Sequence, residues 1–172
     1  VTANGQLVHA SAAENPDLYW GVRGGGGNFG VVTNFEFKLH PMSRKVIAGD
    51  VMFPLSEMKN VLNFYSEYAA SCPEELYLDF VALSQPGSSD GVVLLHACYS
   101  GPVEKADSVL APIAKAGKAF QNTIASVDYT AVQQAFDNTE PRVTGQYMKG
   151  GFVEKIPAGL IDEMATGFKP EF

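Results

Sequence analysis

The segment with the most chemical potential is a run of four glycines at residues 24–27. Glycine loses more conformational freedom on folding than any other residue, so such a run is costly unless the main chain must approach something closely. Gly25, Gly27 and Gly30 also satisfy the letters G-x-G-x-x-G. The chemistry open to this segment is the binding of an anion, such as a pyrophosphate, by backbone N–H groups.

The residues around the glycines exclude the two common nucleotide-binding loops. A dinucleotide fingerprint follows a strand and opens a helix, whereas here a helical pattern precedes the glycines and residues 31–35 read as a strand. A Walker loop needs Lys followed by Ser or Thr, and the glycines are not followed by such a pair. Two interpretations remain open on spacing alone: an anion-binding nest that leads into a strand, and a flexible turn without a ligand.

Other candidate side chains lie on predicted strands. Tyr77 and Asp79 share one face of a strand predicted over residues 76–83, where they either reach a pocket or face solvent. His96 alternates with apolar residues on the next strand, and no second His or carboxylate lies at metal spacing. We therefore interpret His96 as a core or edge histidine and predict no metal site.

The composition is that of a globular protein and excludes several classes. The chain has 172 residues, of which 46% are hydrophobic and 18% charged, so disorder and fibrous structure are excluded. A net charge of −7 without a basic cluster argues against a nucleic-acid partner. The apolar runs, such as residues 92–95, are far shorter than the ~20 residues of a membrane span. Cys72 and Cys98 are too few for a disulfide framework and are expected to be reduced and structural.

The first 43 residues predict one helix between two strands. Residues 6–11 read as a short strand. A helix begins at Asn15 and Pro16, because Asn is a favoured N-cap and Pro is favoured at the first helical position. Over residues 29–39 the odd positions are mostly apolar and the even positions mostly polar, which predicts a long strand with one buried face.

The pattern beyond residue 43 is more regular and predicts the order β-α-β-β-α-β, which is typical of the ferredoxin-like split arrangement. We therefore expect an α+β fold with an antiparallel sheet and helices on one face. The predicted elements are a strand over residues 46–53, a helix over 56–70, strands over 76–83 and 92–99, a helix from Pro102, and a strand over 120–127. A short helix over 129–136, a strand over 146–153 and a last helix near Pro157 follow.

Residues 15–41, with the sequence NPDLYWGVRGGGGNFGVVTNFEFKLHP, closely resemble a stretch of the FAD-linked oxidases of the vanillyl-alcohol-oxidase type. The resemblance is to the berberine-bridge-enzyme-like branch in particular. Shorter stretches at residues 110–113, 128–129 and 147–152 resemble the substrate domain of the same family. The first stretch is long and specific, and together the matches touch most of the chain.

The resemblance implies that residues 1–43 are the C-terminal part of a PCMH-type FAD-binding domain and residues 44–172 a ferredoxin-like substrate-binding domain. It implies that a small organic substrate passes a hydride to FAD and that dioxygen reoxidises the flavin. Tyr147 and Lys149, two apart on a predicted strand, are expected to line the substrate pocket. The residues expected by position to contact or support FAD are Gly26, Gly27, Asn28, Gly30, Val31 and Val32.

The family usually has its main diphosphate-binding loop before the glycine stretch, and often a catalytic acid or base after the substrate domain. The chain begins at Val1 and ends at Phe172. We therefore expect a fragment that binds FAD weakly and does not turn over by itself, and we assign no catalytic residue. The expected partner is a small-molecule substrate, without nucleic acid or membrane. The alternative is a stand-alone ferredoxin-like module whose exposed sheet face binds a partner or forms a homodimer.

Overall fold

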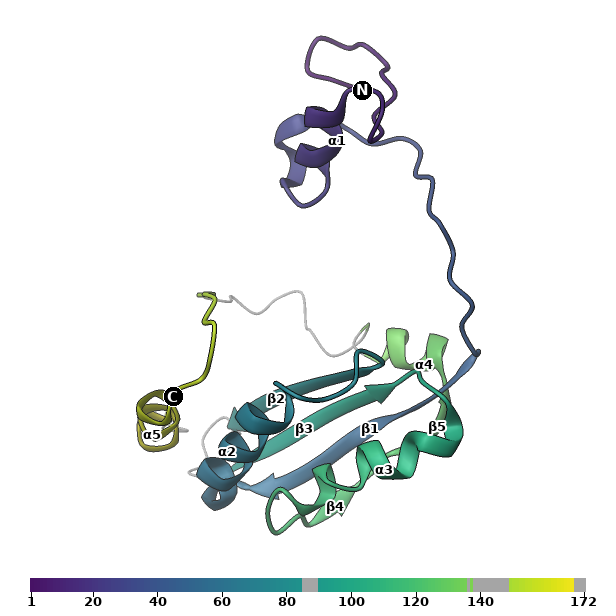
Figure 1. The fold of residues 1–172 in the computed structure, drawn as a ribbon. Coiled ribbons are helices and arrows are strands. Elements are labelled where there is room, and N and C mark those ends of the chain that lie inside the picture. Colours follow the sequence, from purple (N-terminus) through teal and green to yellow (C-terminus); the bar gives the residue numbers. More distant parts are fainter. Residues whose placement is uncertain (85–89, 136, 138–148, 169–172) are drawn as a thin grey trace. The chain divides into compact units, whose positions relative to one another are not determined.

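The computed structural model describes residues 1–84, 90–135, 137 and 149–168. By internal contacts the chain divides into two compact units, Val1–Pro41 and Met42–Phe172. Figure 1 shows the short helix α1 (Pro16–Val22) in the first unit and a sheet with helices in the second. No helix among the described residues is long and apolar enough to cross a membrane.

The first unit is a short helix followed by a glycine turn. Helix α1 (Pro16–Val22) begins at the predicted Asn-Pro pair, with Pro in its first turn. The glycines then lead into a 3-10 turn, η1 (Gly26–Phe29). The ring of Phe29 folds back onto Gly21, where an added Cβ would lie 2.9 Å from the ring. Helix and turn thus pack closely on each other at Gly21, where a larger residue would have to displace the Phe29 ring.

The two strands predicted in this unit are wrong for the described structure, because neither residues 6–11 nor residues 29–39 form a strand. A strand exists only when a neighbouring chain satisfies its backbone N–H and C=O groups. Here a single pairing is present: the N–H of Val31 donates to the carbonyl of Val1 at 2.9 Å, and the amino group of Val1 donates to the carbonyl of Val31 at 2.7 Å. The apolar side chains that were predicted to be buried are exposed in this unit; Phe35, for example, is 66% exposed.

The second unit is built on an antiparallel sheet with the strand order β2-β3-β1-β4, and β5 also pairs with β1. This is the order of the predicted ferredoxin-like arrangement, in which each helical connection skips one strand, and it confirms the α+β fold. The strands are β1 (Lys45–Pro54), β2 (Leu76–Ser84), β3 (Gly91–Tyr99), β4 (Gln121–Asn122) and β5 (Ala125–Asp128).

One face of the sheet is covered by helices, and the core lies between them. The main helix begins after a 3-10 turn, η2 (Leu55–Glu57), so the predicted helix over 56–70 is present in two parts. Fully buried side chains include Phe53 of β1 and Leu95 of β3, which pack against the helices. The helices on this face are α2 (Met58–Tyr68), α3 (Ala106–Leu110) and α5 (Ala158–Gly167), with 3-10 turns η3 (Val103–Lys105) and η4 (Ile113–Lys115) around α3.

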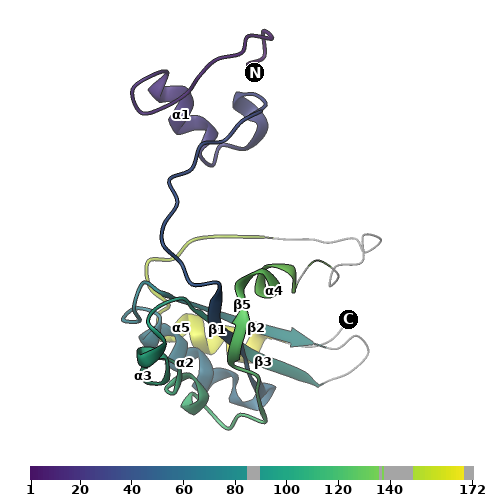
Figure 2. The ribbon, with the colours of Figure 1, turned by 90° about the vertical axis from the view of Figure 1, so that its right-hand side faces the viewer.

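Helix α4 (Tyr129–Gln134) lies on the opposite side of the sheet from α2 and α3, as Figure 2 shows. It contacts β1, where Val46 and Ala48 are buried although they point away from the main core. The rest of this second face, formed by β2, β3 and the later part of β1, carries half-buried and exposed side chains. We call it the open face of the sheet.

The strand predicted over residues 120–127 is interrupted, and β4 and β5 flank the break. The break lies opposite Gly49, whose φ is +151°, and an added Cβ there would lie 2.6 Å from the carbonyl oxygen of Thr123. The hydroxyl of Thr123 accepts the N–H of Asp50 at 2.8 Å, and the N–H of Thr123 donates to the Asp50 carbonyl at 2.8 Å. A side-chain hydroxyl therefore replaces a ladder carbonyl, which ends β4 and lets β5 start again.

The strand predicted over residues 146–153 is not supported where it can be checked. Residues 146–148 lie outside the described part, and residues 149–153 are present without strand structure. The last helix is confirmed, since Pro157 immediately precedes α5.

Candidate functional site

The glycine turn presents bare main chain on one side. Gly26 and Gly27 are exposed, and a Cβ added to either would meet nothing within 4 Å. Gly25, by contrast, packs against the carbonyl of Gly21 and the ring of Phe29. The turn is thus anchored through one glycine and leaves the next two facing open space, where a bound molecule can approach the backbone without meeting a side chain.

The remaining residues expected near FAD occupy different environments. The side-chain amide of Asn28 donates to the carbonyl of Gly25 at 3.0 Å, so this side chain braces the turn. Gly30 has a φ of +135° and lies against the carbonyl of Val1. Val31 and Val32 are 68% and 41% exposed. The structure therefore brings the predicted residues together on one short segment, with Asn28, Gly30 and Val31 holding it and Gly26, Gly27 and Val32 exposed.

The two residues expected to line the substrate pocket, Tyr147 and Lys149, stay a prediction. Tyr147 lies outside the described residues. Lys149 is exposed in a segment without strand structure. Because the alternation rule applies only to a strand, the structure gives no support to a shared face for this pair.

The open face of the sheet carries a row of three ionisable side chains across three strands. The register pairs Asp79 of β2 with His96 of β3, and His96 with Asp50 of β1. His96 Nδ1 lies 2.7 Å from Asp50 Oδ1, and these side chains are 19% and 31% exposed. We call Asp50, His96 and Asp79 the Asp–His–Asp row. A carboxylate at this distance orients the imidazole, as in many sites where a histidine handles a proton or binds a ligand.

Tyr77 extends the row at the edge of the sheet. Its ring meets the His96 imidazole edge-on, with centroids 6.1 Å apart and planes at 68°. Burial raises the pKa of the Tyr77 phenol, and the negative charge of Asp79 and a hydrogen bond to Asp79 raise it further. The phenol therefore stays protonated and donates to the carboxylate. Four polar side chains from three strands thus form one connected group.

Sequence reasoning identified Tyr77, Asp79 and His96 as residues on strand faces but missed Asp50. It also favoured a core or edge role for His96, whereas the structure places His96 between Asp50 and Asp79 in strand register, with its imidazole on the Asp50 carboxylate at the open face. The sequence carried no signal for the pairing, because Asp50 and His96 are 46 residues apart. Their contact follows from the register of β1 against β3.

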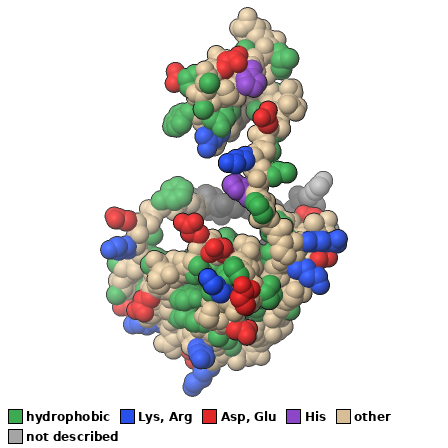
Figure 3. All heavy atoms as spheres, turned by 45° about the vertical axis from the view of Figure 1, so that its right-hand side comes forward, with side chains coloured by type: hydrophobic (Ala, Val, Ile, Leu, Met, Phe, Trp, Pro, Cys, Tyr) green, Lys and Arg blue, Asp and Glu red, His purple; other side chains and the backbone are tan. Residues whose placement is uncertain are grey.

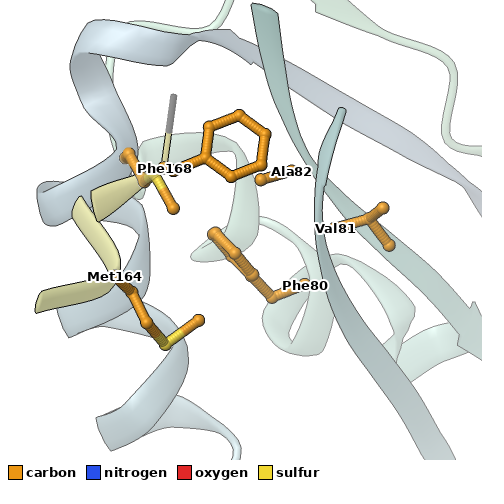
Figure 4. A pocket seen from close by; sticks show the side chains of 6 residues that line it. Phe80, Val81, Ala82, Met164 and Phe168 are labelled. Carbon is orange, nitrogen blue, oxygen red and sulfur yellow. The ribbon is translucent and has the colours of Figure 1, made fainter. Parts of the chain in front are cut away.

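A second feature is an apolar hollow of about 420 Å³ between α2, α5 and β2. Its wall is formed by Met58, Phe80, Ala82, Met164 and Phe168 together with Val81. Figure 4 shows the side chains of Phe80, Met164 and Phe168 pointing toward one another and Val81 pointing away. The hollow offers packing but no hydrogen-bonding chemistry, so the open face is the better candidate site.

Charges elsewhere suggest no further site. On the face of the second unit drawn in Figure 3, acidic and basic side chains are interspersed. Among the described residues no group of three or more His, Cys, Asp or Glu side chains is arranged to hold a metal ion.

Burial raises the pKa of the Cys98 thiol, which lies on the open face next to Tyr77 in register.

Comparison with known proteins finds FAD-linked oxidoreductases among the relatives of this chain. No protein-family model matches the chain. An FAD-linked oxidoreductase of Dictyostelium discoideum is 33% identical over 165 residues, which cover 94% of this chain and 35% of that protein. The FAD-linked oxidoreductase azaG of Aspergillus niger is 33% identical over 113 residues, or 65% of this chain and 24% of that protein.

Solved structures that are similar to this chain include two oxidases. The 6-hydroxy-D-nicotine oxidase of Arthrobacter nicotinovorans matches with a TM-score of 0.70 and 26% identity, over 83% of this chain and 32% of that one. The xylooligosaccharide oxidase of Myceliophthora thermophila matches with a TM-score of 0.63 and 26% identity, over 80% of this chain and 29% of that one. The chain thus spans about a quarter to a third of the length of these four proteins.

Proposed function

Because this chain belongs to the FAD-linked oxidoreductases of the vanillyl-alcohol-oxidase type, we propose that it supplies parts of two domains of such an enzyme. In this proposal the first unit is the end of the FAD-binding domain, and the second unit is the substrate-binding domain. The observation that carries the proposal is the glycine turn, whose exposed main chain is suited to the close approach of a cofactor.

The chemistry of the turn fits FAD. Gly26 and Gly27 leave open space where a Cβ would otherwise project. Backbone N–H groups in such a turn can point toward a phosphate or a flavin oxygen. In the proposal Val31 and Val32 provide apolar contact, and Asn28 and Gly30 hold the shape of the turn. These residues bind and orient the cofactor and take no part in bond making.

The open face of the sheet is proposed to hold the substrate. When bound, FAD accepts a hydride from a small organic substrate, and dioxygen is the proposed final acceptor. The Asp–His–Asp row and Tyr77 offer hydrogen-bond donors and acceptors that can fix the orientation of a substrate. Lys149 and Tyr147 remain proposed pocket residues on the resemblance alone, as does membership of the berberine-bridge-enzyme-like branch.

The alternative, a stand-alone binding or dimerisation module, is not favoured. A relative that matches 94% of the chain is an FAD-linked oxidoreductase, and in our proposal the open face binds the substrate of such an enzyme and not a second copy of the chain.

The test is to express the full reading frame that encodes this chain and record its absorbance spectrum after purification. We expect a flavin spectrum, either at once or after addition of FAD. Residues 1–172 alone are expected to retain little FAD. A full-length protein that folds, stays colourless and gains no bound flavin with added FAD would refute the proposal.

A matched pair of variants tests the role of the turn. Gly27→Val places a side chain in the open space of the turn and should lower the FAD content without unfolding the protein. Gly159→Val makes the same change in α5, where a Cβ also meets nothing within 4 Å, and should leave the FAD content unchanged. Equal FAD content in the two variants would remove the turn from the cofactor site.

A further inference from the structure

The Asp–His–Asp row has a charge that its own residues do not balance. It holds two carboxyl groups and one imidazole, so the acidic groups outnumber the basic one. No Lys or Arg side chain among the described residues forms an ion pair with Asp50 or Asp79. Carboxylates in a partly buried site, with no described Lys or Arg paired to them, attract a positively charged group more strongly than they would in bulk water.

The surroundings of the row suit an organic cation better than a metal ion. Tyr77 is 57% exposed and its ring lies next to the row, so an aromatic ring that a cation can contact is part of this exposed site. Two residues along the strands, Val81 and Leu94 are paired on the same open face. Apolar side chains can contact the carbon atoms of a ligand, whereas a hydrated metal ion would gain nothing from them.

The contacts within the row hold these groups in place. The main chain of Asp50 is held by two 2.8 Å hydrogen bonds to Thr123 in the β4–β5 break: its N–H donates to the Thr123 hydroxyl, and its carbonyl accepts the N–H of Thr123. Asp50 in turn holds the His96 imidazole, and the imidazole meets the Tyr77 ring edge-on. Asp50 and His96 are therefore positioning residues, while Asp79 and Tyr77 are the groups at the edge of the sheet that a ligand would contact.

We propose that Asp79 and Tyr77 form a subsite for a protonated amine or a quaternary ammonium group, so that the substrate of this enzyme is an organic amine. This inference rests on the proposed function, because it assumes that the open face receives the substrate. Binding at this subsite makes and breaks no covalent bond. The carboxylate supplies charge, the ring supplies its electron-rich face, and the neighbouring apolar pair supplies contact with the carbon skeleton.

The experiment compares two probes of equal shape on the FAD-loaded full-length protein. The probes are choline and its uncharged carbon analogue, in which a tert-butyl group replaces the trimethylammonium group. Ligand-observed NMR titration gives the affinity of each. We expect choline to bind at least about tenfold more tightly than the analogue, since both charge and ring favour the cation.

Four variants locate the preference. Asp79→Asn keeps the shape of the side chain and should reduce the preference to less than about threefold. Tyr77→Leu should reduce it as well, whereas Tyr77→Phe keeps the ring and should retain it. Asp107→Asn removes an exposed carboxylate on α3, on the helix-covered side, and should change nothing.

The outcomes separate this inference from the proposed function. A protein without bound FAD fails the proposed function. A protein that holds FAD but binds choline no better than the analogue, or binds neither, overturns the amine subsite and leaves the flavin assignment standing. A preference that survives in Asp79→Asn also overturns the subsite.

Discussion

Gly49→Ala is the substitution whose effect can be worked out most directly from the structure. At a φ of +151° an L-residue is strained, which costs about 1–3 kcal/mol. The added methyl group would also lie 2.6 Å from the carbonyl oxygen of Thr123 and 2.8 Å from the Cα of Ile124. Both are main-chain atoms, and Thr123 is held to Asp50 by hydrogen bonds, so neither can move away cheaply.

Overpacking of this kind adds about 1–3 kcal/mol. The expected loss in the free energy of unfolding is therefore about 2–6 kcal/mol, a large part of the ~5–15 kcal/mol that stabilises a typical domain. In a chain of this size the melting temperature should fall by at least about 4 °C. Denaturant unfolding followed by circular dichroism measures the change in free energy, and a thermal scan measures the melting temperature.

Gly159→Ala is the matched control. It makes the same chemical change in α5, where a Cβ meets nothing within 4 Å, and alanine is favoured over glycine inside a helix. This variant should be as stable as the parent or slightly more stable. If Gly49→Ala unfolds at the same denaturant concentration as Gly159→Ala, the close approach of β1 to the β4–β5 break is wrong.

Three further predictions concern the core and the open face. Phe53→Ala removes a fully buried side chain and should lower the free energy of unfolding by about 3–5 kcal/mol in a denaturant titration. Phe120→Ala changes a 58% exposed position and should lower it far less. Equal losses would contradict the assigned core. In a Cys72→Ser variant, Cys98 is the thiol that reacts with iodoacetamide. Because burial raises the pKa of Cys98, this thiol should react near pH 8 more slowly than free cysteine. A faster reaction would count against its burial. Because the pKa of Tyr77 is raised above 10.0, the folded state holds this proton more tightly than the unfolded state. The resulting stability is present below pH 10.0 and is lost as the pH rises through the raised pKa. In an alkaline absorbance titration, Tyr77→Phe should remove one phenol that ionises above pH 10.0.

The local parts of the fold were predictable because their signals are local. The apolar spacing within α2 and the alternation within β3 each depend on neighbours a few residues away, and both elements are present as predicted. Proline marked the start of α1 for the same reason, whereas Asn15 makes no side-chain cap hydrogen bond and its amide donates to the carbonyl of His9 at 2.7 Å. The β-α-β-β-α-β order then limited the sheet to few topologies, which is why the ferredoxin-like arrangement could be inferred.

The errors lie where a partner distant in sequence decides the outcome. Residues 29–39 have the alternation of a strand, but alternation does not supply the neighbouring chain that a strand needs. The strand over 120–127 is interrupted because Gly49, more than 70 residues earlier, lets Thr123 approach and bond to Asp50. Neither partner can be read from the segment itself.

The candidate site divides in the same way. The sequence by itself determined the bare main chain at Gly26 and Gly27, since the absence of a side chain is a property of the residue. It also determined that Tyr77 and Asp79 share a face, because they are two apart on one strand. Only the tertiary structure decided that His96 lies between Asp79 and Asp50, because strand register is set by the packing of the whole sheet. A slip of one residue in the register would have turned these side chains to opposite faces.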